Sequence, residues 1–127
     1  MIELEELTKK LLVAQLPPNS EVDQLALLDL DFVSITKTDK EISVITYEED
    51  FPQNLESIAK VEKDWVGFRV KGTLEFNQYG ILSSLLEPLA KAKISVFVFS
   101  TYDTDYIMVK SKDAGSVKAV LAMNFKE

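Results

Sequence analysis

The sequence predicts an α+β fold built from two related units, each with the element order βαββαβ. Three observations support this prediction. Apolar residues alternate in some segments and recur at helical spacing in others, as strands and helices require. Two β-rich hairpins, at residues 32–48 and 94–110, lie about half a chain apart. In the second hairpin both faces of one strand are apolar, so we expect helices on one face of its sheet and a second layer on the other.

The first half begins with an expected edge strand at residues 2–7, where Ile2 and Leu4 alternate with glutamates. A second strand at residues 11–16 must stop before Pro17, which cannot continue a ladder.

A helix is expected next, with a cap at Asn19 or Ser20 and the apolar positions Val22, Leu25, Ala26 and Leu28. The first hairpin should turn at residues 38–40. One or two helical turns are expected within residues 54–60.

The second half opens with an expected strand at residues 65–70. An amphipathic helix follows, whose apolar stripe is Ile81, Leu85, Leu89 and Ala92. Pro88 lies inside this helix and removes the hydrogen bond to the Ser84 carbonyl. After the second hairpin, Asp113 is expected to cap a last helix that carries Val117, Val120 and Leu121.

The two hairpins align without gaps at an offset of 65 residues, which predicts a duplicated unit. The matched pairs are Phe32 with Phe97, Val33 with Val98, Thr36 with Thr101, Ile42 with Ile107, and Val44 with Val109. We therefore expect a degenerate unit at residues 1–60 and a better formed unit at residues 61–127. The second unit lacks a fourth strand, and we expect residues 2–7 to return and supply it.

Composition excludes several kinds of function. The 127 residues include neither Cys nor His, so disulfides, thiolate zinc sites and Ser-His-Asp catalysis are impossible. A net charge of −7 argues against nucleic acid and anionic membrane surfaces as partners. The N-terminal run is acidic and only briefly apolar, which favours a cytoplasmic protein without a signal peptide or membrane span. We expect no cofactor, no metal and no enzymatic activity.

One stretch is specific enough to indicate a family. The segment YGILSSLLEPLAKAKISVFVFSTYDTDYIMVK, residues 79–110, resembles the ACT domain. The similarity is greatest to the ACT branch of small bacterial tandem proteins and of the cytosolic arginine sensor CASTOR. This resemblance implies tandem ferredoxin-like units with antiparallel sheets and helices on one face. It also implies an amino-acid effector and a regulatory role in trans, in a homo-oligomer or with a partner enzyme.

The residues themselves are compatible with such a site. Gly80 opens a helix, so the amides of Gly80, Ile81 and Leu82 lack acceptors within it and could bind a ligand carboxylate. Across the sheet, a strand ends where its backbone groups are free to pair with a ligand. The resemblance places the effector along this segment and at the start of the next strand, with Asp105 receiving an ammonium or guanidinium group. These candidate residues are Phe99, Ser100, Thr101, Thr104 and Asp105.

Structural explanations remain open for the same residues. Gly80 could serve only a tight turn, and Asp103 and Asp105 could serve only hairpin chemistry. Glu75 and Asn77 precede Gly80 and could touch a ligand or simply be solvated. The two-sided apolar sheet could equally belong to an interaction or dimerisation module without a ligand. In the gapless alignment Lys40 stands at the position of Asp105, so the first unit is expected to be a scaffold without its own site.

Overall fold

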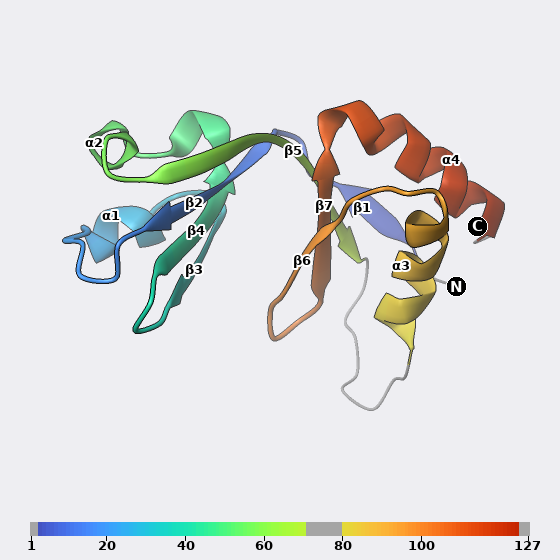
Figure 1. The fold of residues 1–127 in the computed structure, drawn as a ribbon, viewed down its shortest axis with the longest axis horizontal. Coiled ribbons are helices and arrows are strands. Elements are labelled where there is room, and N and C mark those ends of the chain that lie inside the picture. Colours follow the sequence, from blue (N-terminus) through green and yellow to red (C-terminus); the bar gives the residue numbers. More distant parts are fainter. Residues whose placement is uncertain (1–2, 71–79, 125–127) are drawn as a thin grey trace. The chain divides into compact units, whose positions relative to one another are not determined.

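The computed structural model describes residues 3–70 and 80–124. The chain forms two compact units (Figure 1). Lys9–Asp64 make up the N-terminal unit, and Met1–Thr8 together with Trp65–Glu127 make up the C-terminal unit. The expected boundary lay after residue 60; here the division falls after Asp64, and the first eight residues are grouped with the C-terminal unit.

The N-terminal unit has the order βαββαβ, and its sheet has the strand order β3-β4-β2-β5. Its elements are β2 (Leu11–Leu16), α1 (Gln24–Leu28), β3 (Val33–Lys37), β4 (Ile42–Tyr47), a 3₁₀ turn (Glu48–Asp50), α2 (Gln53–Glu56) and the first part of β5 (Lys60–Val70). Both helices lie on one face, since Leu27 of α1 and Leu55 of α2 share a core with alternate residues of β2 and β4.

Helix α1 differs from its prediction in cap and burial. Asp23, not Asn19 or Ser20, caps it, and its Oδ1 accepts a hydrogen bond of 3.1 Å from the Ala26 amide. Leu27 is the buried position. Leu25 and Leu28 are 82% and 68% exposed, because the helix has only five residues and turns a single side toward the sheet.

The C-terminal unit repeats the same topology with the order β6-β7-β5-β1. Its elements are the second part of β5, α3 (Ile81–Lys91), β6 (Phe97–Ser100), β7 (Asp105–Lys110), a 3₁₀ turn (Ser111–Asp113), α4 (Ala114–Asn124) and β1 (Leu4–Glu6). Strand β1 pairs antiparallel with β5, with Leu4 opposite Val70 and Glu6 opposite Phe68. The prediction that the N-terminal run completes this sheet is therefore confirmed.

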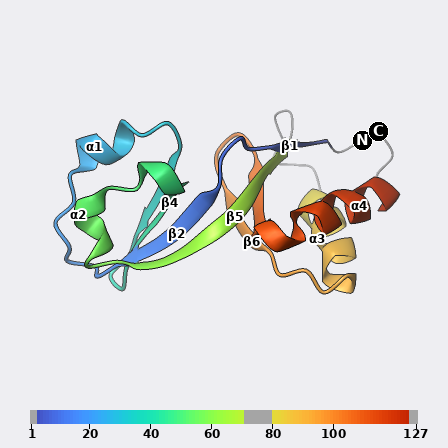
Figure 2. The same ribbon diagram turned by 90° about the horizontal axis from the view of Figure 1, so that it is seen from above.

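Helices α3 and α4 lie next to each other on one face of this sheet (Figure 2). Leu85 and Leu89 of α3 and Val117 and Leu121 of α4 pack in one core with residues of β5 and β7. Helix α3 continues through Pro88. Among the described residues, no helix is long and apolar enough to cross a membrane.

The two hairpins correspond at an offset of 63 residues rather than 65. Strands β4 and β7 begin at Ile42 and Asp105, and the 3₁₀ turns after them begin at Glu48 and Ser111. The turns agree as well, because the Thr38 and Thr101 amides each donate to the carbonyl three residues on, both at 2.9 Å. The gapless alignment is thus two residues out of register. Asp105 corresponds to the buried Ile42, and Lys40 corresponds to Asp103.

Candidate functional site

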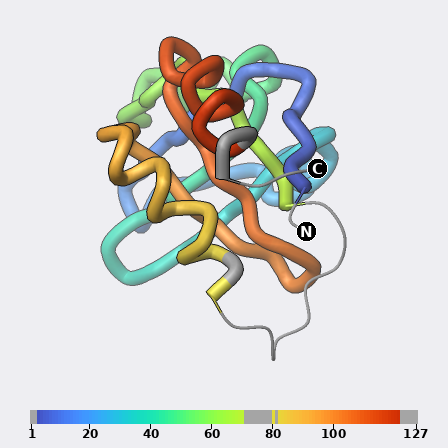
Figure 3. The backbone as a smooth tube through the Cα atoms, turned by 90° about the vertical axis from the view of Figure 1, so that its right-hand side faces the viewer, coloured from blue at the N-terminus to red at the C-terminus, as the bar shows by residue number. Residues whose placement is uncertain are grey.

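The predicted site residues belong to one end of the C-terminal unit. Strand β5 ends at Val70, and Ser100 at the end of β6 lies opposite Asp105 at the start of β7. Figures 1 and 3 show the turn between β6 and β7 at the same end of the unit as the start of α3. The register and the topology therefore bring the hairpin turn and the helix start to a shared edge.

Thr101 and Thr104 close this turn. The Thr104 amide donates to the Thr101 hydroxyl oxygen at 3.3 Å. The Thr104 side chain is 3% exposed, and its hydroxyl donates to the Val70 carbonyl at 2.9 Å. This bond extends the β5–β7 ladder beyond the first residue of β7, so Thr104 has a structural role.

Ser100 and Asp105 form a polar pair on the helix side of the sheet. Two residues further along each strand, Val98 and Ile107 pack in the core beneath the helices, and strand residues two apart share a face. The Ser100 hydroxyl donates to Asp105 Oδ1. Asp105 is half-buried, and this hydrogen bond fixes the orientation of its carboxylate at the rim of the apolar core.

Gly80 adopts the left-handed region, with φ +73°, directly before α3. Its carbonyl accepts bonds from the Ser84 amide at 2.8 Å and the Ser84 hydroxyl at 2.7 Å. This conformation alone accounts for a glycine. No described heavy atom lies within 4 Å of where a Cβ would be. Leu82 packs against the core, which leaves only its amide for a ligand.

Phe99 is on the other side of the sheet from Ser100 and Asp105. Its ring stacks on Tyr106 with a centroid distance of 4.9 Å and an interplanar angle of 3°. Trp65 and Phe97 form a second ring pair at 5.9 Å. The structure thus groups Ser100, Thr101, Thr104 and Asp105, and separates the Phe99 ring from them. Glu75 and Asn77 lie outside the described residues, as does the Ile81 side chain.

An ion pair that the sequence analysis missed lies at the same end of the unit, with Arg69 on the face of the sheet that carries Phe99 and Tyr106. Arg69 Nη2 is 2.8 Å from Asp103 Oδ2, and the Arg69 side chain is 26% exposed. Arg69 is the sequence's only arginine and comes one residue before the end of β5. A single arginine near the end of a strand could have been noted as a candidate site residue from the sequence. Its partner, Asp103, could not, because that contact depends on how β5 pairs with β7. Among the described residues no three acidic side chains gather as a metal site would need.

Comparison with known proteins agrees with this fold. The family model of the ACT domain matches residues 60–122. The human protein CASTOR3P is 32% identical in an alignment 103 residues long that covers 74% of this chain and 63% of that protein. The mouse cytosolic arginine sensor for mTORC1 subunit 1 is 31% identical in an alignment 101 residues long that covers 75% of this chain. The chain spans 30% of that relative's length.

Solved structures agree as well. The crystal structure of an Agrobacterium tumefaciens protein is 31% identical, with a TM-score of 0.83 over 97% of this chain and 88% of that one. The aspartate kinase of Clostridium acetobutylicum matches in fold, with 15% identity and a TM-score of 0.70 over 97% of this chain and 34% of the kinase. The regulatory subunit of aspartate kinase from Thermus thermophilus matches with 10% identity and a TM-score of 0.67, over 98% of each chain.

The family match covers the strand, helix and hairpin that carry the candidate site. The matched residues contain the antiparallel pairs β5–β7 and β6–β7 and the helices that pack on one face of these strands. The chain therefore belongs to the ACT domain family, with residues 60–122 as the matching domain.

Proposed function

We propose that this chain is a regulatory module that binds an amino acid between the start of α3 and the Ser100–Asp105 pair. The observation that carries the proposal is this oriented carboxylate on the same face of the sheet as α3. In this arrangement the ligand carboxylate meets the amides of Gly80, Ile81 and Leu82. The ligand's ammonium or guanidinium group meets Asp105.

The charges at the two ends of the proposed site are opposite, as a zwitterion requires. A helix N-terminus carries partial positive charge and free N–H groups, which favours a carboxylate. Asp105 offers charge-assisted hydrogen bonds, each worth about 1.5–3 kcal/mol. Since relatives are named as cytosolic arginine sensors, arginine is the first ligand to test and the cytoplasm the expected location.

Isothermal titration calorimetry with the twenty L-amino acids tests the proposal. We expect one amino acid to bind, and Asp105→Asn to weaken it by about 10- to 100-fold, because the charge-assisted bond is lost. Asp39→Asn is the matched control, since Asp39 is an exposed turn residue of the other hairpin. Binding that is equal in Asp105→Asn and the unmodified chain would remove Asp105 from the site. Absence of binding across all twenty would overturn the function.

The structural neighbours of this chain include the regulatory subunit of an aspartate kinase. We therefore propose that this ACT-family chain is a regulatory module without enzymatic activity of its own. The module would act in trans on a partner enzyme or as a homo-oligomer.

A ligand-free interaction module is the second candidate, and the ring pairs on the helix-free face of the C-terminal sheet favour it. Light scattering with and without each amino acid decides between the two. A stable oligomer that no amino acid affects supports the interaction module.

A further inference from the structure

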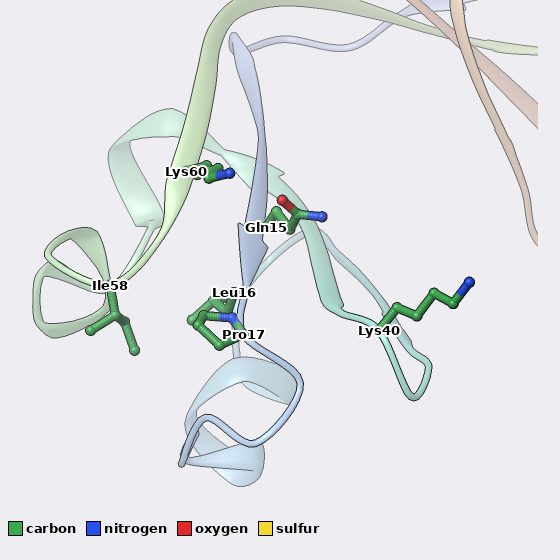
Figure 4. Close-up of a pocket in the computed structure, with 6 residues that line it drawn as sticks. All are labelled: Gln15, Leu16, Pro17, Lys40, Ile58 and Lys60. Atoms are coloured by element: carbon green, nitrogen blue, oxygen red, sulfur yellow. The ribbon is translucent and has the colours of Figure 1, made fainter.

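The N-terminal unit has a hollow of about 230 Å³ that the sequence did not indicate. It is lined by the end of β2, the turn between β3 and β4, and the segment that leads into β5 (Figure 4). The lining residues are Gln15, Leu16, Pro17, Lys40, Ile58 and Lys60. At about 30 Å³ for each water-sized group, the hollow has room for about eight such groups, which suits a small organic molecule.

The hollow lies where the C-terminal unit has its ion pair. Gln15 is opposite Ser43, and Arg69 is opposite Tyr106, so Gln15 occupies the position of Arg69. Lys40 occupies the position of Asp103. In the C-terminal unit the two positions are bridged by a 2.8 Å ion pair. In the N-terminal unit an amide and an ammonium group stand there instead, and they cannot form such a pair.

The polar part of the hollow is cationic. Among the described residues, neither Lys40 nor Lys60 has an ion-pair partner. The Gln15 amide donates to Glu41 Oε1 at 3.2 Å, which leaves that carboxylate as the nearby opposing charge. Figure 4 shows the polar ends of Gln15, Lys40 and Lys60 directed to one side, with the Lys40 chain extended outward. Both lysines are exposed, so their side chains are free to turn toward a ligand.

The other part of the hollow is apolar. Leu16 is buried, Pro17 follows it at the end of the strand, and Ile58 is 46% exposed. Figure 4 shows Leu16 and Pro17 together and Ile58 on a separate segment, with the end of Lys40 pointing away from all three. Covering Ile58 with an apolar group would remove hydrophobic surface from water.

We propose that this hollow binds a small monocarboxylate with an apolar tail. The tail lies against Leu16, Pro17 and Ile58, and the carboxylate meets the ammonium groups of Lys60 and Lys40. The site is separate from the proposed amino-acid site, and neither proposal depends on the other.

Two-dimensional ¹H–¹⁵N NMR titration of the full chain tests this site with three probes. 4-Methylpentanoate has the tail and the charge, 4-methylpentan-1-ol has the tail alone, and acetate has the charge alone. We expect saturable shifts around Leu16, Ile58 and Lys60 with 4-methylpentanoate, and weaker binding of the other two. Equal binding of the alcohol would overturn the anionic ligand class. No saturable shift with any probe would overturn the site.

Charge substitutions give a signed test. Lys60→Gln should lower the affinity for 4-methylpentanoate by about twofold to fivefold, the usual range for an exposed charge pair. Glu41→Gln should raise the affinity by a similar factor, because the substitution removes a negative charge that repels the ligand carboxylate. Lys37→Gln, an exposed change on β3 outside the lining, is the matched control. If Lys37→Gln lowers the affinity for 4-methylpentanoate as much as Lys60→Gln does, the ligand is attracted nonspecifically by positive charge, and the proposal is overturned.

The same spectra separate this proposal from the amino-acid site. Amides of Ser100 and Asp105 report on that site, and amides around Leu16 and Ile58 report on the hollow. Failure of one set to respond therefore leaves the result for the other intact.

Discussion

Replacing Thr104 by valine tests whether its buried hydroxyl holds the hairpin to the end of β5. Thr104 is 3% exposed, and its hydroxyl donates to the Val70 carbonyl at 2.9 Å. Valine has nearly the same shape but no donor. Water cannot reach this place to compensate, so the Val70 carbonyl is left without this partner.

The expected cost follows from that geometry. A buried polar group that loses its partner costs about 1–3 kcal/mol. With a urea dependence of about 1–2 kcal/mol/M for a chain of this size, the midpoint of unfolding should fall by about 1 M. Thr104→Ser keeps the hydroxyl and should retain more of the stability than valine does.

Urea unfolding followed by circular dichroism and by Trp65 fluorescence is the assay, since Trp65 belongs to the C-terminal unit. Thr46→Val is the counterpart in the N-terminal unit, where the fully buried Thr46 hydroxyl donates to the Phe32 carbonyl at 2.7 Å. The reasoning is refuted if Thr104→Val unfolds at the same urea concentration as the unmodified chain, or if serine proves worse than valine.

Three further predictions concern stability. Lys93→Gly should stabilise the fold by about 0.5–1 kcal/mol in urea unfolding, because Lys93 has φ 61° in the Schellman turn that ends α3; a loss of stability would contradict this. Removal of residues 1–8 should lower the unfolding midpoint reported by Trp65, because β1 is the fourth strand of that sheet; an unchanged midpoint would contradict it. The hydrogen bond to Asp64 raises the pKa of Lys10 above 10.5, so the contribution of this pair is present at neutral pH and lost as pH rises through the raised pKa. The difference in urea midpoint between the unmodified chain and Lys10→Gln should therefore shrink above pH 10.5, and a difference that persists at higher pH would count against it.

Much of the fold was readable from the sequence because its strands and helices have clear periods. Strand β2 has the predicted bounds of residues 11–16, which Pro17 fixes. Helix α3 buries Leu85 and Leu89 as its stripe predicted. The return of the N-terminal run to the second sheet also followed from counting strands in a βαββαβ unit.

Other features were missed because local patterns do not carry them. Residues 60–64 are mostly charged and were not predicted as a strand, yet they form the first part of β5. The boundary between the units falls after Asp64, whose φ is 74°. The gapless repeat was two residues out of register because matches among β-branched residues are common in any strand. Hydrogen bonding at the turns fixed the correspondence instead.

By itself, the sequence determined the element order, the apolar faces and the exclusion of Cys and His chemistry. Those depend on residue type and on spacing along the chain. Only the tertiary structure decided which side chains meet. Arg69 joins Asp103, the Ser100 hydroxyl orients Asp105, and the hollow at Lys40 has no counterpart of that ion pair. Strand register sets these contacts, and register depends on how distant segments pack together, which no local pattern encodes.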